Sequence, residues 1–175
     1  MGRGNGVMKH LVLDGQQVIL RPLISAYFYD YLSQFSLPVC NALQINDPQS
    51  EFDYLKLCIK KIELNLTIFN CIFIMQTNQL IGAIEIRHQP SSAGQLYSWL
   101  NHHWWGTGVF EIAMQLSARN YFCLSGAQSF NAHVYLENKR SYYALKKCGF
   151  VDDGMHDGWQ GLQYNLVLKK DTAKT

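Results

Sequence analysis

A glycine-threonine-glycine step in the middle of the chain has the residue types that bind phosphate. It lies in NHHWWGTGVF (residues 101–110), where Gly106 and Gly108 precede a run with helical spacing. The first turn of a helix offers unpaired backbone N–H groups and a partial positive charge, and glycines let a phosphate approach without a Cβ in the way. The third glycine of a dinucleotide fingerprint and the lysine of a Walker motif are missing. Taken alone, the step also fits an ordinary strand-to-helix turn.

A second group of residues follows later in the chain. The segment ENKRSYYALKKCGF has Asn138 at its start, Ser141 one helical turn on, and Gly149 followed by Phe150 at its end. Asparagine is a good helix N-cap and glycine a good helix stop, so this segment is predicted to be a short capped helix.

The two segments together resemble the GNAT superfamily of N-acetyltransferases. In that family an Arg/Gln-x-x-Gly-x-Gly/Ala motif holds the pyrophosphate of coenzyme A, and an Asn-x-x-Ser...Gly-Phe element lies along the pantetheine arm. The start VILRPL, the run LIGAIEIRH and the run LYSWLNHHWWGTG are most similar to the RimJ/RimL branch, which acetylates protein N-termini and other primary amines. The resemblance extends from about residue 17 to 169.

The resemblance implies acetyl-CoA as cosubstrate and a set of residues that bind it. Backbone N–H groups at the end of one strand are expected to face the thioester arm, and the glycine motif to hold the pyrophosphate. The expected set is Trp99, Leu100, Asn101, His103, Trp104, Trp105, Gly106, Thr107, Gly108, Val109, Asn138 and Ser141. Of the two tryptophans before the glycines, one is expected to pack and the other to be exposed in the loop.

The chain departs from the family pattern at two positions. His103 stands where the family usually has arginine or glutamine, so one clamp on the pyrophosphate is altered while the backbone donors remain. Leu145 stands where many members carry a tyrosine that protonates the leaving thiolate. The usual acid is therefore absent.

Three residues are candidates for proton transfer. His133 is the first candidate for the base, since an imidazole with a pKa near ~6.5 accepts a proton at neutral pH; a surface or hydrogen-bonded histidine is the other interpretation. Glu85 is the second candidate; a solvated charge beside Arg87 is the other interpretation. Tyr142 neighbours the position of the missing acid, although a helical tyrosine commonly packs against the core instead.

The expected reaction is direct attack of a primary amine on acetyl-CoA in a ternary complex. The acceptor is a protein N-terminus, a polyamine or another small amine. The alternative is a coenzyme-A-binding sensor or structural protein that has lost turnover, which the changes at His103 and Leu145 motivate. A third interpretation, an unrelated α/β interaction module, requires that coenzyme A does not bind.

These residues need a framework of strands and helices, and the hydrophobic periodicity predicts one. Turn chemistry and caps separate the elements, with Ser25 as N-cap of the first helix, Ser50 or Asp47 as N-cap of the second, and a turn around Pro38. The predicted strands are 16–23, 67–76, 80–88, 94–101, 129–137 and 158–169, and the predicted helices are 24–35, 50–64, 106–122 and 138–150.

This order predicts a mixed α/β fold. Three consecutive strands form an antiparallel meander, and the late strand-helix-strand unit requires a parallel pair. The family resemblance implies a GNAT-type sheet that splays between its fourth and fifth strands, here 94–101 and 129–137. We expect a single domain over residues 16–170, with a flexible segment 1–15 and a tail 171–175.

Alternation along two segments gives finer expectations. Leu80, Gly82, Ile84 and Ile86 are expected on one face of their strand, which places Glu85 off the apolar side. The acidic, glycine-rich stretch 152–161 is expected to be a turn between the last strands. Its aspartates either attract a cationic acceptor or are simply solvated, and they are Asp152, Asp153 and Asp157.

Composition narrows the classes of partner. The chain has 175 residues, 48% of them hydrophobic, and a formal charge of +2 without a basic stripe, so neither nucleic acid nor membrane is an expected partner. Five cysteines without a CxxC pair fit a reducing cytosol. No metal is expected, because His102 and His103 are thought to point apart and no cysteine joins them at ligand spacing. The sequence leaves the oligomeric state open, and a homodimer is one candidate.

Overall fold

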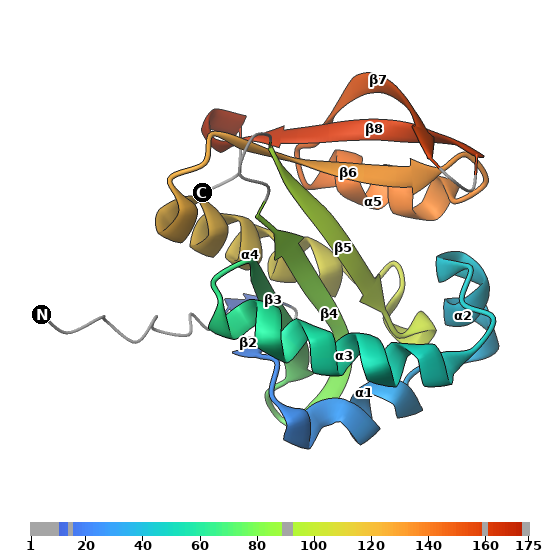
Figure 1. Cartoon of the computed structure of the whole chain (residues 1–175). Coiled ribbons are helices and arrows are strands. Elements are labelled where there is room, and N and C mark those ends of the chain that lie inside the picture. The colour runs from blue at the N-terminus through green and yellow to red at the C-terminus, as the bar shows by residue number, and fades with distance from the viewer. Residues whose placement is uncertain (1–10, 14–15, 89–92, 159–160, 173–175) are drawn as a thin grey trace, which may run out of the picture.

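One mixed β-sheet is the framework of the molecule (Figure 1). The structure is a computed structural model, and it describes residues 11–13, 16–88, 93–158 and 161–172. The strands of this part are β1 Leu11–Leu13, β2 Gln16–Pro22, β3 Thr67–Ile74, β4 Gln79–Arg87, β5 Gly94–Leu100, β6 Ser129–Tyr135, β7 Val151–Gly158 and β8 Gly161–Lys169. They are ordered β1-β2-β3-β4-β5-β6-β8-β7 in the sheet.

The helices connect these strands. They are η1 Ser25–Tyr27, α1 Phe28–Ser33, α2 Leu37–Leu43, α3 Pro48–Glu63, η2 His102–Trp104, α4 Val109–Ser125, α5 Lys139–Lys147 and η3 Lys170–Thr172, where η marks a 3₁₀ helix. Every pair of neighbouring strands is antiparallel except β5 and β6, which are parallel. The mixed α/β fold, the meander of β3 to β5 and the late parallel pair are confirmed.

The N-terminal half holds three corrections. A short strand, β1, pairs with β2 inside the segment 1–15 that we expected to be flexible. Ser25 is not a helix cap, because it is the first residue of η1, and Ile24 takes the cap position. The expected turn around Pro38 is instead the first turn of α2. Proline is tolerated there because the N–H groups of a first helical turn have no partner within the helix.

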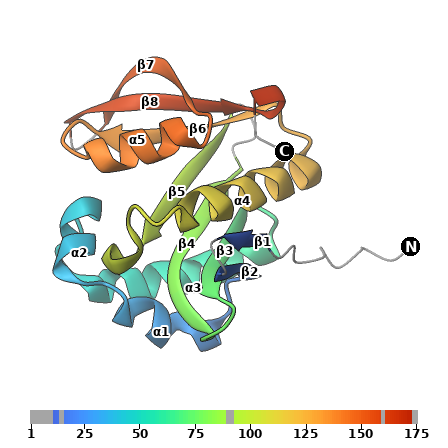
Figure 2. The same ribbon diagram turned by 180° about the vertical axis from the view of Figure 1, so that it is seen from behind.

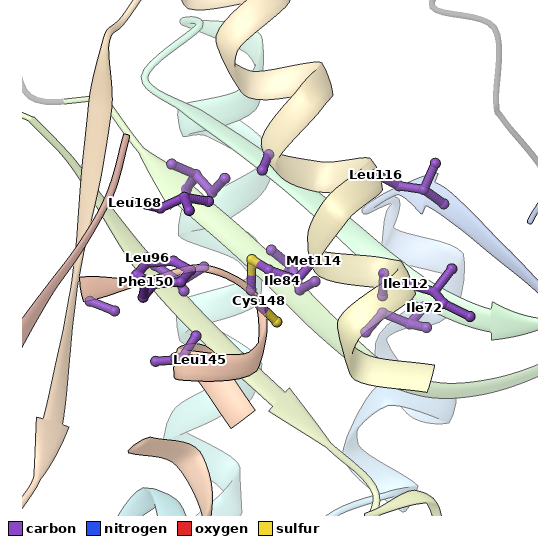
Figure 3. Close-up of a cluster of buried hydrophobic side chains, with 14 of the residues drawn as sticks. Ile72, Ile84, Leu96, Ile112, Met114, Leu116, Leu145, Cys148, Phe150 and Leu168 are labelled. Carbon is purple, nitrogen blue, oxygen red and sulfur yellow. The ribbon is translucent and has the colours of Figure 1, made fainter. Parts of the chain in front are cut away.

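Two hydrophobic cores cover the two faces of the sheet. Figures 1 and 2 show α1 and α3 against one face and α4 against the other. On the α4 side, Ile84, Leu96 and Met114 pack with side chains of α5 and the last strands, as Figure 3 shows. On the opposite side, Leu55 of α3 packs with Phe69 of β3. The strands of the meander are therefore buried on both faces.

Glu85 lies on the opposite face of β4 from Ile84, as expected, but that face is also buried. Its side chain lies on the face that α3 covers and is only 2% exposed. The alternation of β4 is also interrupted, because Ile72 pairs with Gly82 whereas Phe73 pairs with Leu80, which leaves one extra residue in β4. Leu80 consequently lies in the α3-side core and not beside Ile84.

The parallel pair holds for three residues only. Gly94 to Leu96 of β5 pair with Phe130 to Ala132 of β6, and no pairing follows along the described residues of the two strands. Figure 1 shows β5 and β6 diverging from that point toward α2. The expected splay is thus present, between the fifth and sixth strands because β1 adds one to the count.

The C-terminal part is a hairpin. Residues 152–158 belong to β7, which pairs with β8, so most of the stretch expected as a turn is strand. A register shift between Asp152 and Met155 interrupts the pairing. Before this hairpin, α5 begins at the N-cap Asn138, as predicted, and the chain leaves it through Gly149 at a φ of +96°.

Candidate active site

Two cavities meet where β5 and β6 separate. The first has a volume of about 240 Å³ and lies between the loop before α4, α5 and α2. The second, of about 550 Å³, lies between α3, β4, β5, β6 and the C-terminal hairpin. Both are lined by the same six residues at their junction, which are Ala42, Leu43, Ser98, Trp99, Asn138 and Ser141. Two ligands, one in each cavity, would therefore come into contact at this junction.

The glycine step forms one wall of the first cavity. Gly106 and Gly108 line it with left-handed φ angles of +76° and +83°, which favour glycine. A Cβ on Gly106 would meet nothing within 4 Å, so the backbone is open to a bound group. Gly108 also caps α4, so the first N–H groups of that 17-residue helix lie beside the cavity.

Both tryptophans before the glycines are half-buried. Trp104 and Trp105 line the first cavity and pack against the α4-side core, so neither is exposed in the loop as expected for one of them. The indole N–H of Trp105 donates to the carbonyl of Leu100 at 2.8 Å. This bond holds the ring against the end of β5.

Cationic residues of α5 face the glycine step, and the sequence motifs did not reveal them. Arg140 and Lys147 line the first cavity. The guanidinium of Arg140 lies over the Trp105 ring, 3.2 Å from its centre. Glu111, in the first turn of α4, lines the same cavity. The two cations outnumber this carboxylate, so the cavity suits an anionic ligand.

Asn138 and Ser141 lie at the junction of the two cavities. The Asn138 Oδ1 accepts the backbone N–H of Ser141 at 3.1 Å, which caps α5 as the spacing predicts. The Asn138 Nδ2 donates to the carbonyl of Ala42 in α2 at 3.3 Å. One side chain therefore joins the start of α5 to the helix that closes the splay.

The backbone of β5 presents alternate residues to the splay. The N–H of Asn101 donates to the carbonyl of Ile81 in β4 at 2.7 Å. In an antiparallel ladder the bonded residues alternate, so Trp99 also points its N–H toward β4, whereas Ser98 and Leu100 point theirs toward β6. Of the expected backbone donors from Trp99 to Asn101, only Leu100 faces the splay, and Ser98 is an additional one.

Several expected coenzyme-binding residues lie outside both cavities. Asn101 donates to Gln34 and accepts the N–H of His103, while His103 is exposed and its ring is tilted by 38° against that of His102. Thr107 donates to the carbonyl of Trp104. The residues of the expected set that line neither cavity are Asn101, His103, Thr107 and Val109. Trp99 lines both, and its indole N–H donates to Tyr31 at 2.7 Å.

Glu85 is part of a buried polar cluster in the second cavity. Its carboxylate accepts from Arg87 Nε at 3.1 Å, from Thr67 at 3.0 Å and from the hydroxyl of Tyr54. The pKa of nearby Glu51 is raised, first by burial and then by the charge of Glu85. The carboxylate of Glu85 is therefore engaged by three side chains rather than solvated.

His133 lines the second cavity from β6. Its ring stacks on that of His156 with centres 3.7 Å apart and planes at 14°. Burial, and then the charge of His156, lowers the pKa of His133. The imidazole is therefore neutral at neutral pH, as a base must be.

Tyr142 does not approach the junction. Its hydroxyl donates to the carboxylate of Asp152 at 2.9 Å, and its ring packs on Tyr164. The candidate acid is therefore directed away from the two cavities. Leu145 lines the second cavity as a buried side chain without a proton to give. Ser141 brings a hydroxyl to the junction instead.

The three aspartates of the C-terminal hairpin have different surroundings. Asp152 forms an ion pair with Lys146 at 2.7 Å, and Asp153 accepts from Asn165. Only Asp157 lines the second cavity. Of the three, Asp157 alone is placed to attract a cationic acceptor.

The histidine pair before the glycine step lies closer than expected. The rings of His102 and His103 are 3.9 Å apart in η2, so they do not point apart, and His102 also contacts the hydroxyl of Ser36 at 2.8 Å. In the described residues, no group of three or more histidine, cysteine or acidic side chains is arranged to hold a metal ion. The same part of the chain contains no helix long and apolar enough to cross a membrane.

The fold is that of an acyltransferase. The model of the GNAT acetyltransferase domain matches residues 17–151, and the chain belongs to that family. RimJ and RimL acetyltransferases are among the solved structures that share its fold. A search of curated protein sequences found no match.

Solved structures share this fold at low sequence identity. The ribosomal-protein-S5-alanine acetyltransferase of Vibrio fischeri has 15% identity and a TM-score of 0.71, over 95% of this chain and 100% of that one. The spermidine N-acetyltransferase of Vibrio cholerae, solved with CoA and spermine, has 18% identity and a TM-score of 0.73, over 89% of this chain and 96% of that one. The Mycobacterium smegmatis RimJ, solved with CoA-disulfide, has 14% identity and a TM-score of 0.75, over 94% of this chain and 87% of that one.

Proposed function

We propose that this protein transfers an acetyl group from acetyl-CoA to a primary amine. The observation that carries the proposal is the junction of the two cavities at the splay, where Ser98, Asn138 and Ser141 line both. The first cavity takes the coenzyme and the second the acceptor. A peptide N-terminus and a polyamine are the acceptors that the acetyltransferases of similar fold suggest.

The first cavity fits a coenzyme A pyrophosphate. The open backbone at Gly106 and the helix N-terminus at Gly108 supply N–H donors. Arg140, from the opposite side, supplies the charge that His103 does not. The N–H groups of Ser98 and Leu100 face the pantetheine arm, in place of strand pairing with β6.

Proton transfer falls to two side chains at the second cavity. The bound thioester supplies an activated acetyl carbonyl. His133 takes the proton of the attacking amine as the N–C bond forms and the C–S bond breaks. Ser141 donates its hydroxyl proton to the leaving sulfur while its oxygen takes a proton from solvent, so no serine alkoxide forms. Glu85 has a structural part in this proposal, since it holds Arg87 and Tyr54 in the acceptor wall.

Calorimetry with acetyl-CoA tests the first half of the proposal. We expect micromolar binding by the wild type and none by Gly108→Trp, whose side chain fills the cavity. Gly126→Trp is the matched control, because Gly126 ends the same helix at a similar φ of +69° in open space. Failure of the wild type to bind would refute the proposal.

Release of free thiol tests the second half. We expect thiol to appear only when acetyl-CoA and a primary amine are both present. Binding without release across peptide, polyamine and small amine acceptors would leave the alternative, a coenzyme-A-binding protein without turnover. Its motivation is the apolar Leu145 in place of an acid.

A further inference from the structure

An amide acceptor lies buried and unsatisfied beside the acceptor cavity. The Nδ2 of Asn165 donates to the backbone carbonyl and to the carboxylate of Asp153, both at 3.2 Å. The Oδ1 of the same amide is buried, and no donor is in hydrogen-bonding geometry with it. A buried acceptor without a partner is costly, so it calls for an explanation.

The orientation of this amide is fixed by chemistry. If the amide were flipped, its oxygen would face two acceptors of Asp153 and its N–H groups would face the unsatisfied site. That exchange loses both bonds to Asp153, so the orientation with Nδ2 toward Asp153 is the favourable one. Asp153 thereby directs Oδ1 to the other side of Asn165.

His133 lies on that other side. It pairs directly with Asn165 in the register of β6 and β8, and opposite residues of an antiparallel pair place their side chains next to each other on one face. The side chain of Asn165 also opposes the lowering of the pKa of His133, as an acceptor facing a ring N–H does. His133 carries a ring N–H to offer.

We propose that Asn165 is a positioning residue for His133: its Oδ1 accepts one ring N–H and so keeps the lone pair of the other ring nitrogen facing the acceptor cavity. The inference rests on the proposed function for its catalytic consequence. When His133 takes the proton of the amine, the bond to Oδ1 strengthens because its donor is then charged. Asp153, Asn165 and His133 form a relay that orients the base without exchanging protons.

Other groups also act on the charge of His133, and they come from every element around it. On the C-terminal strands, His156 stacks on its ring and Asp157 lines the same cavity. The remaining titratable or charged side chains that line this cavity are Tyr31, Glu51, Tyr54, Glu85, Arg87, Tyr97 and Tyr135. Substitutions at Asn165 leave this set unchanged, so a change in the titration of His133 reports on the amide.

Nuclear magnetic resonance of the histidine side chains tests the contact without any ligand. The signals of His133 are assigned with His133→Gln. We expect one fixed neutral tautomer in the wild type and a mixture in Asn165→Ala, together with a lower pKa for His133. Asn165→Asp keeps the shape and adds a negative charge, so it should raise that pKa. Asn120→Ala, on α4 outside both cavities, is the matched control.

Kinetics then test the role in catalysis. We expect Asn165→Ala to lower kcat about tenfold with the KM for amine and for acetyl-CoA unchanged. The acid limb of kcat should move to lower pH in Asn165→Ala and to higher pH in Asn165→Asp. A merely structural role would leave the pH profile in place and change stability alone.

The two proposals can fail separately. An unchanged tautomer and pKa of His133 in both Asn165 variants overturns the positioning role, even if the wild type acetylates amines. Acetyl-CoA that does not bind the wild type overturns the proposed function, while the resonance data still decide whether Asn165 and His133 interact.

Discussion

The guanidinium of Arg140 lies over the indole of Trp105, with its central carbon 3.2 Å from the centre of the ring. The contact joins the first turn of α5 to the loop before α4, across the wall of the first cavity. Planar stacking of this kind suits arginine and not lysine. It places a cation opposite the glycine step with little freedom to leave.

Removal of this cation should weaken coenzyme binding. We expect Arg140→Ala to raise the Kd of acetyl-CoA about tenfold, because one charge-assisted contact to phosphate is lost. Arg140→Lys should recover part of the affinity, since it keeps the charge but not the stacked plane. Calorimetry measures both, with Arg119→Ala on the exposed side of α4 as control. Equal affinity in Arg140→Ala and wild type would show that the glycine step binds alone.

The pair of Arg87 and Glu85 should matter for stability. Glu85 is 2% exposed, so Arg87→Met leaves a buried carboxylate without its cation, and we expect the free energy of unfolding to fall by about 3 to 5 kcal/mol. Arg87→Met with Glu85→Gln should cost less than Arg87→Met alone, because no charge is then buried unpaired. Urea denaturation compares them, and an equal loss in both variants would contradict this account.

The stacked histidines should set the acid limit of activity. The pKa of His133 is lowered, so His133 stays neutral until the pH falls below its ordinary value, and activity is lost as the pH falls through the lowered value. His156→Phe removes the neighbouring charge, which should raise the pKa of His133 and move the acid limb of kcat/KM to higher pH. His88→Phe, outside both cavities, is the control. An unmoved limb would assign it to another group.

The hydroxyl of Ser141 should affect turnover and not binding. We expect Ser141→Ala to lower kcat about tenfold, below the usual effect of an acid catalyst because a thiolate leaves readily. The Kd of acetyl-CoA should stay within about twofold, since the cap on Asn138 uses the backbone N–H of residue 141. Ser117→Ala is the matched control, because its hydroxyl is buried on α4 without a partner. An unchanged kcat would leave protonation of sulfur to water.

Local patterns predicted most of the fold. The periodicity around Ile112 and the cap at Asn138 depend on neighbours in sequence, and both elements were found as expected. The helix at Pro38 was missed because proline at a helix start looks like a turn. The face of Leu80 was wrong because a bulge opposite Ile72 and Phe73 depends on strand pairing, which alternation cannot reveal.

The residues of the candidate site also fall into those that local sequence predicts and those that depend on the folded structure. The glycines at 106 and 108 could be recognised from the sequence, because the left-handed backbone of this turn favours glycine at both positions. Arg140 and Asn165 could not be found, because their roles depend on Trp105 and His133, which only the folded sheet brings near. The burial of Glu85 could not be predicted from alternation, because it depends on α3, which lies elsewhere in the chain.

The two hydrogen bonds of the Asn138 side chain have a kinetic consequence. The same amide caps α5 beside the first cavity and donates to the carbonyl of Ala42 in α2, a helix that lines the second cavity. A ligand that fixes the position of α5 therefore also fixes α2, which lies beside the proposed amine site. We expect an ordered sequence of addition, acetyl-CoA before amine, visible as product inhibition by free coenzyme A that is competitive against acetyl-CoA and noncompetitive against amine.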